Sequence, residues 1–174
     1  MLEAERFSLL QILSQLSRML ESGKVKILIP QEYQISVERK RVMRAFLSYC
    51  IRALKILNDY TGQLVLDRQE FGIETTAVAR PSLGKFFVYA KNRGFADILR
   101  SIAHELVHIR QHEKDPDRYR NVLNVHFSSE YEDEANKIAG ELINAFTEVV
   151  GYDIVYEGKN AYRAKTVGTR RNLG

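Results

Sequence analysis

Two histidines four residues apart flank a glutamate in the segment Ile102-Ala103-His104-Glu105-Leu106-Val107-His108-Ile109. Positions four apart lie on one face of a helix, about 6 Å apart along its axis, so both imidazoles can point toward one ion. Glu105 follows His104 directly and projects beside that ion, where a carboxylate can take a proton from water. We therefore predict that His104 and His108 bind a metal and that Glu105 is a general base.

The alternative interpretation is a helix with two surface histidines that bind nothing. Apolar residues fill most of the surrounding turns, at positions 98, 99, 102, 103, 106, 107 and 109. This pattern predicts that both histidines are largely buried, and buried imidazoles without partners are energetically costly. The metal site is therefore the favoured interpretation.

A catalytic zinc site uses three protein ligands and leaves one position open for water. His112 continues the same helix face but lies about 12 Å from His104 along the axis, which is too far for a shared ion. The remaining candidates are one histidine and the acidic residues that open a third predicted helix: His126, Glu130, Glu132 and Glu134.

The apolar face of that third helix separates these candidates. At 100° per residue, Glu132 lies within about 60° of the centre of the face, Glu134 about 100° away and Glu130 about 140° away. We predict Glu132 as the third ligand, with Glu134 and His126 as open alternatives. Without a metal, the three glutamates would be a solvated first turn stabilised by the helix N-terminus. Asn136, one turn after Glu132, is expected to hydrogen-bond a ligating histidine.

The elements that position these residues can be read from hydrophobic periodicity and turn signals. Helices are predicted over 5–21, 37–60, 97–113 and 130–150, and strands over 25–29, 64–66, 73–79 and 85–90, with a polar stretch over 114–129. The order predicts an α+β fold in which helices pack on a three- to four-stranded sheet and the metal site lies between two helices. We expect one domain over 1–157, made of a helical part (1–62) and a part with the sheet and the metal-binding helices (63–157), followed by a basic tail (158–174).

Composition excludes several classes of protein. The 174 residues include 45% hydrophobic and 28% charged residues, which are values typical of a globular domain. The single cysteine, Cys50, excludes an intrachain disulfide framework and a cysteine-based zinc site. No stretch has the ~18 apolar residues of a membrane span, and the N-terminus lacks the features of a signal peptide, so we expect a soluble cytoplasmic protein. The net charge of +4 is modest, but the basic tail could bind an acidic partner or nucleic acid.

His-Glu-Leu-Val-His followed by Glu132-x-x-Ala135-Asn136-x-x-Ala139 resembles the gluzincin class of zinc metallopeptidases, and small ImmA/IrrE-type domains in particular. The resemblance covers roughly residues 85–146 and implies a zincin-like fold with Zn²⁺ as cofactor. It also implies that Glu132 is a ligand, that Asn136 orients a histidine, and that the strand before the metal helix, 85–90, pairs with an extended substrate.

Together these features predict a zinc metallopeptidase that hydrolyses peptide bonds with metal-activated water and Glu105 as general base. Three residues near the metal-binding segments are candidate donors to the oxyanion: Tyr119, His126 and Tyr131. One alternative is a zincin-fold module with a structural metal, whose surfaces bind a partner. Another is a nucleic-acid-binding protein in which the histidine motif is incidental.

Overall fold

The computed structural model describes residues 25–124 and 129–156. The elements along the chain are β1 (Val25–Leu28), α2 (Val37–Leu54), β2 (Tyr60–Val65), β3 (Ala77–Arg80), a 3-10 turn (Pro81–Leu83), β4 (Lys85–Tyr89), α3 (Phe95–Lys114), α4 (Pro116–Asn124) and α5 (Ser129–Val150). The predicted α+β class is confirmed, and the sheet has four strands. The helix predicted over 5–21 and the basic tail lie outside the described residues, so both stay predictions.

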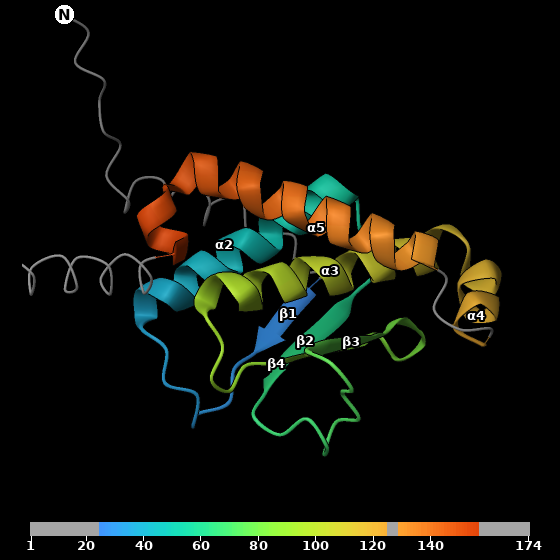
Figure 1. Cartoon of the computed structure of the whole chain (residues 1–174), viewed down its shortest axis with the longest axis horizontal. Coiled ribbons are helices and arrows are strands. Elements are labelled where there is room, and N and C mark those ends of the chain that lie inside the picture. The colour runs from blue at the N-terminus through green and yellow to red at the C-terminus, as the bar shows by residue number, and fades with distance from the viewer. Residues whose placement is uncertain (1–24, 125–128, 157–174) are drawn as a thin grey trace, which may run out of the picture.

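The four strands are arranged in the order β1-β2-β4-β3 (Figure 1). β2 is parallel to both β1 and β4, whereas β3 is antiparallel to β4. Parallel neighbours need a long crossover connection, and α2 supplies the one between β1 and β2. A short turn is enough between β3 and β4, where Gly84 has a φ of 63°, a left-handed conformation that glycine adopts without steric cost. β1 and β3 are therefore the two edges of the sheet.

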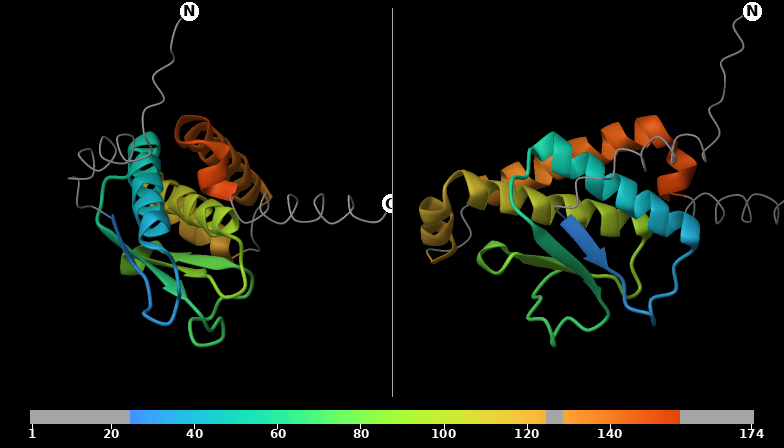
Figure 2. Two further views of the ribbon diagram at one scale, coloured as in Figure 1. Left: turned by 90° about the vertical axis from the view of Figure 1, so that its left-hand side faces the viewer. Right: turned by 180° about the vertical axis from the view of Figure 1, so that it is seen from behind.

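The long helices α2, α3 and α5 lie on one face of the sheet (Figures 1 and 2). α3 is the central helix, since it packs against α2, α5, β3 and β4. The largest side chains of the core between these elements are fully buried, among them Phe46, Phe86, Phe146, Ile102 and Leu106. In the described part of the chain, no helix is both long and apolar enough to cross a membrane.

α2 ends at Leu54, and the prediction of a helix over 37–60 is wrong in its last part. The residue after Leu54 has a left-handed conformation, and the following segment is held by Glu113 from α3. The Glu113 carboxylate accepts hydrogen bonds from the backbone N–H groups of Leu57 and Asn58 at 2.9 and 2.8 Å. Bonds from a distant helix thus stabilise a non-helical backbone that local periodicity does not indicate.

The short helix α4 lies in the polar stretch 114–129, for which the sequence pattern predicted no helix. Asp115 Oδ1 accepts a hydrogen bond from the Arg118 N–H at 2.9 Å, as an N-cap residue does. Pro116 occupies the first helical position, where a missing N–H costs nothing. The Asp-Pro pair that ends α3 therefore also begins α4.

The predicted strand boundaries around the loop 66–76 also need correction. β2 covers 60–65 rather than 64–66, and β3 covers 77–80 rather than 73–79. Ile73 is buried with Val65 and Phe87 in a small apolar cluster on the sheet face opposite the long helices. Its apolar side chain therefore anchors a loop and does not mark a strand.

Candidate metal centre and cleft

α3 carries both histidines on its side facing α5. Ile102, Leu106 and Ile109 are fully buried, which fixes the rotation of the helix about its axis. His104 and His108 then lie one turn apart, with their Nε2 atoms separated by 3.0 Å. His108 is buried and His104 is half-buried. The helical spacing in the sequence thus brings the two imidazoles together.

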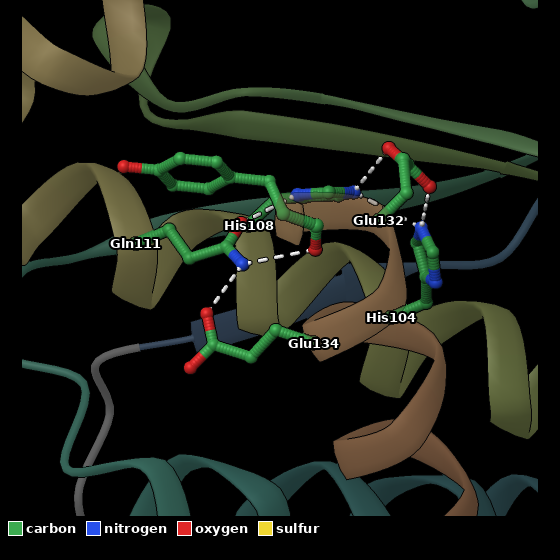
Figure 3. Close-up of polar contacts among 6 residues, drawn as sticks. His104, His108, Gln111, Glu132 and Glu134 are labelled. Carbon is green, nitrogen blue, oxygen red and sulfur yellow. Dashed lines mark hydrogen bonds and ion pairs between the residues drawn. The ribbon is translucent and has the colours of Figure 1, made fainter. Parts of the chain in front are cut away.

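Glu132 comes from the first turn of α5 and bridges the two rings (Figure 3). Its Oε2 lies 3.2 Å from His104 Nε2, and its Oε1 lies 3.1 Å from His108 Nε2. Glu130 and Glu134 are exposed and do not join them. The apolar face of the helix predicted that Glu132 lies near His104 and His108, and this prediction is confirmed.

The three donor atoms are close enough to share one ion. They all lie within 4.8 Å of one another, so the group could hold a metal ion. Metal–ligand bonds of about 2.1 Å in a tetrahedron place donors about 3.4 Å apart, close to the separations of 3.0–3.2 Å seen here. Burial lowers the pKa of His104, and the neighbouring His108 acts in the same direction. A lowered pKa favours neutral imidazole, which is the form that binds metals.

Each histidine is oriented by an amide side chain. The Oε1 atom of Gln111 lies 2.8 Å from His108 Nδ1, and its Nε2 donates to Glu134 Oε2 at 2.8 Å (Figure 3). The Asn136 side chain forms a hydrogen bond with His104. An acceptor at Nδ1 of His108 places the proton there, so the lone pair of Nε2 is available to a cation held with Glu132. Sequence reasoning missed Gln111, although it lies three residues after His108 on the same helix face.

Glu105 lies beside the histidines without being one of the three clustered donors. It is 4% exposed, and its carboxylate accepts a hydrogen bond from the backbone N–H of Ala79 in β3. Burial, followed by the charge of Glu132, raises the pKa of Glu105 to about 8. A cation bound nearby would act in the opposite direction. A carboxylate in this place can exchange a proton with a molecule bound next to the histidines.

A cleft of about 760 Å³ opens beside these residues, between β3 and α3. Along the β3 side it is lined by Gly72 and residues 74–79, and along the helix side by Arg93, Asp97, Arg100, Ser101, His104, Glu105, His108, Tyr119, Glu132 and Asn136. Glu105 and the three clustered donors thus share one concave surface, which is the usual form of a small-molecule or peptide site.

Of the candidate oxyanion donors, Tyr119 lies in this cleft. Tyr119 is 5% exposed, and the centroid of its ring lies 6.3 Å from that of His108. Burial, with the charges of Glu105 and Glu132, raises the pKa of the Tyr119 hydroxyl, so it keeps its proton. Tyr131 lines a separate cavity of about 240 Å³ between α3, α4 and α5. The third candidate, His126, lies outside the described residues.

The strand expected to pair with an extended substrate needs correction. The segment 85–90 contains β4, which is paired with β2 on one side and β3 on the other, so it has no free edge. Within 25–124 and 129–156, the sheet edge next to the cleft belongs to β3, which pairs only with β4. The Tyr89 N–H donates to the Thr76 carbonyl at 2.9 Å, and hydrogen-bonded pairs alternate along an antiparallel ladder. The backbone groups of Ala77 and Ala79 are therefore directed away from β4, toward the cleft.

No protein-family model, no curated protein and no solved structure matches this chain.

Proposed function

We propose that this chain is a zinc-dependent peptidase that cleaves an extended peptide bound along β3. One observation carries the proposal. His104, His108 and Glu132 converge in the same cleft as Glu105, a buried carboxylate that is not among the clustered donors. A purely structural metal site does not need the Glu105 carboxylate, and a fourth protein ligand would complete its coordination.

His104, His108 and Glu132 would hold the zinc ion through two Nε2 atoms and a carboxylate oxygen. Bound there, zinc would act as a Lewis acid and make water a nucleophile at neutral pH. Glu105 takes the proton of the attacking water and delivers it to the leaving amine. The Tyr119 hydroxyl, which keeps its proton and lies in the same cleft, donates to the oxygen on which negative charge develops.

The free edge of β3 supports a peptide as the substrate. An extended peptide can add to such an edge as a further strand, with main-chain hydrogen bonds giving affinity. Ala77 and Ala79 pack toward the helices with the smallest side chains that have a Cβ, which leaves room for a chain between β3 and α3. The N–H and carbonyl of Ala77 and the carbonyl of Ala79 would pair with it, since the Ala79 N–H already donates to Glu105.

The test is Glu105→Gln, which keeps the volume of the side chain and removes its basicity. Zinc content and melting temperature should change little, while turnover of a peptide library should fall by roughly 10²- to 10⁴-fold. Glu141→Gln, an exposed position on α5, is the matched control and should behave as wild type.

The proposal fails if Glu105→Gln cleaves as fast as wild type. If neither protein cleaves any peptide and the variant also loses zinc, the metal is structural and the chain is a binding module.

A further inference from the structure

The cleft continues beyond the clustered donors, along β3 toward the first turns of α3. There its walls include Thr75 and Ala77 on one side and Arg93, Asp97 and Arg100 on the other. Glu105 contacts Ala79, and Ser101 precedes Glu105 by one helical turn. Four residues of helix advance about 6 Å and two residues of strand about 6.6 Å, so each turn of α3 along the cleft corresponds to about two residues of β3.

Two of the charged groups in this part of the cleft are already engaged. Arg93 donates to the Tyr89 carbonyl at 2.8 Å, to the Asp97 carbonyl at 3.0 Å and to Ser101 Oγ at 2.9 Å. Burial lowers the pKa of Arg93, and the negative charge of Asp97 opposes that shift. Asp97 lies in the first turn of α3, where the helix N-terminus stabilises a carboxylate. Because of these contacts, Arg93 and Asp97 form part of the cleft wall and are not free to bind a ligand.

Arg100 differs from both. It is exposed, it lines the cleft, and it lies one turn before His104, about 6 Å along the helix axis. Among the residues that the structure describes, none forms an ion pair or hydrogen bond with its guanidinium. Glu74 lines the opposite wall of the same cleft and is exposed without contacting Arg100. The cleft therefore contains a guanidinium that is free to bind an anion.

The direction of a bound peptide decides which anion comes within reach. Antiparallel pairing is the commoner arrangement, and a peptide antiparallel to β3 passes Ala79 first, then Ala77 and Thr75. Its part after the cleaved bond therefore runs toward Arg100. About two extended residues cover the distance of one helical turn.

We infer that Arg100 binds a carboxylate located about two residues after the cleaved bond. This inference rests on the proposed function for the position of that bond. A planar guanidinium suits a carboxylate because it donates two parallel hydrogen bonds. The carboxylate can be an acidic side chain or the free C-terminus of the peptide, and the experiment below separates the two.

The experiment measures binding, with turnover as a separate readout. Zinc-loaded Glu105→Gln protein is titrated with fluorescein-labelled hexapeptides by anisotropy. The peptides form three matched sets, which are neutral with an amidated C-terminus, neutral with a free C-terminus, and amidated with one Glu moved through the positions. The same titrations are made with Arg100→Gln and with Arg110→Gln added. Arg110 lies on the same helix outside the cleft and serves as the control.

Arg100→Gln should weaken binding of carboxylate peptides by about five- to tenfold, a size expected for a charge-assisted hydrogen bond that water partly screens. Neutral peptides and the Arg110→Gln control should be unaffected. An effect confined to free C-termini identifies the terminal carboxylate, and an effect confined to one Glu position identifies an acidic side chain.

Equal loss for neutral and carboxylate peptides, no loss for either, or no peptide binding at all would overturn the inference. Cleavage by the protein with Glu105 intact is recorded in parallel. Charge-dependent binding without cleavage would leave Arg100 as a carboxylate site and remove the peptidase proposal. Cleavage of neutral and carboxylate peptides at equal rates would leave the peptidase proposal and remove Arg100 as a carboxylate site.

Discussion

At the scale of single residues, Glu132 and Glu134 have different environments although they are two positions apart on α5. Glu132 contacts the Nε2 atoms of both histidines. Glu134 accepts a hydrogen bond from Gln111, which in turn contacts His108. One glutamate is therefore placed to bind a metal directly, and the other supports the amide that orients a ligand.

Substituting these two glutamates should give graded losses of zinc affinity. Glu134→Ala should weaken binding by no more than the roughly 10- to 100-fold typical of groups that orient a ligand. Glu132→Ala should weaken it further, because one of three donors is lost. Competition with a chromophoric chelator measures both affinities, and equal losses would contradict the assignment of Glu132.

The two tyrosines near the centre offer a matched pair for the oxyanion donor. Tyr119→Phe keeps the ring that packs near His108 and removes the hydroxyl from the cleft. Loss of one such donor typically lowers kcat by about 10²- to 10³-fold, with zinc content unchanged. Tyr131→Phe, in the neighbouring cavity, should leave turnover as it is. Steady-state kinetics of both variants decide between them, and the opposite pattern would assign the role to Tyr131.

At the scale of elements, β3 combines two tasks. Its inner side pairs with β4, and its outer side faces α3 across the cleft. Backbone groups alternate between these sides, so Val78 bonds to β4, while the Ala77 groups and the Ala79 carbonyl are directed toward the cleft and the Ala79 N–H donates to Glu105. A short edge strand can thus present a small number of backbone donors and acceptors to a bound peptide without weakening the sheet.

Proline substitutions along β3 should separate its two sides. Ala77→Pro removes an N–H that is directed into the cleft, a position where an edge strand tolerates proline. Peptide binding should weaken by about two- to tenfold, the worth of one hydrogen bond, while stability changes little. Val78→Pro removes an N–H bonded to β4 and should lower the free energy of unfolding by about 1–3 kcal/mol. Urea denaturation and peptide titration test the pair of variants. A large loss of stability in Ala77→Pro would contradict the assignment of the Ala77 N–H to the cleft side of β3.

At the scale of the whole molecule, the centre joins α3 to α5. His104 and His108 belong to one helix and Glu132 to the other, and a polar stretch and α4 separate the two helices along the chain. Carboxylate and imidazole groups in one small volume carry desolvation costs that a cation offsets. An ion that binds only the folded arrangement must stabilise the fold.

Zinc should therefore raise the melting temperature. Binding at a hundredfold excess over Kd contributes about 2.7 kcal/mol, which for a chain of this length corresponds to about 5–11 °C. Thermal unfolding with zinc and with a chelator measures the shift. His104→Ala should melt at the same temperature under both conditions. If the melting temperature of the wild-type protein is the same with zinc and with a chelator, the proposed metal centre is contradicted.

The sequence by itself was sufficient for those features that depend on helical periodicity. Spacing of four residues places His104 and His108 together, and the phase of an apolar face selects Glu132 over its two acidic neighbours. Both are properties of one regular helix, in which the direction of each side chain follows from its position. The buried surfaces of α3 and α5 then bring the two faces into contact.

The tertiary structure decided the rest, because the remaining features depend on contacts between segments distant along the chain. Glu113 of α3 ends α2 through hydrogen bonds to backbone N–H groups more than fifty residues earlier. The order β1-β2-β4-β3 gives the free edge to β3, and local propensity carries no information about which strand lies at an edge. Tyr119 enters the cleft only because α4 forms after α3. Strand order and side-chain bonds between elements are selected when the whole chain packs, and a local pattern cannot show them.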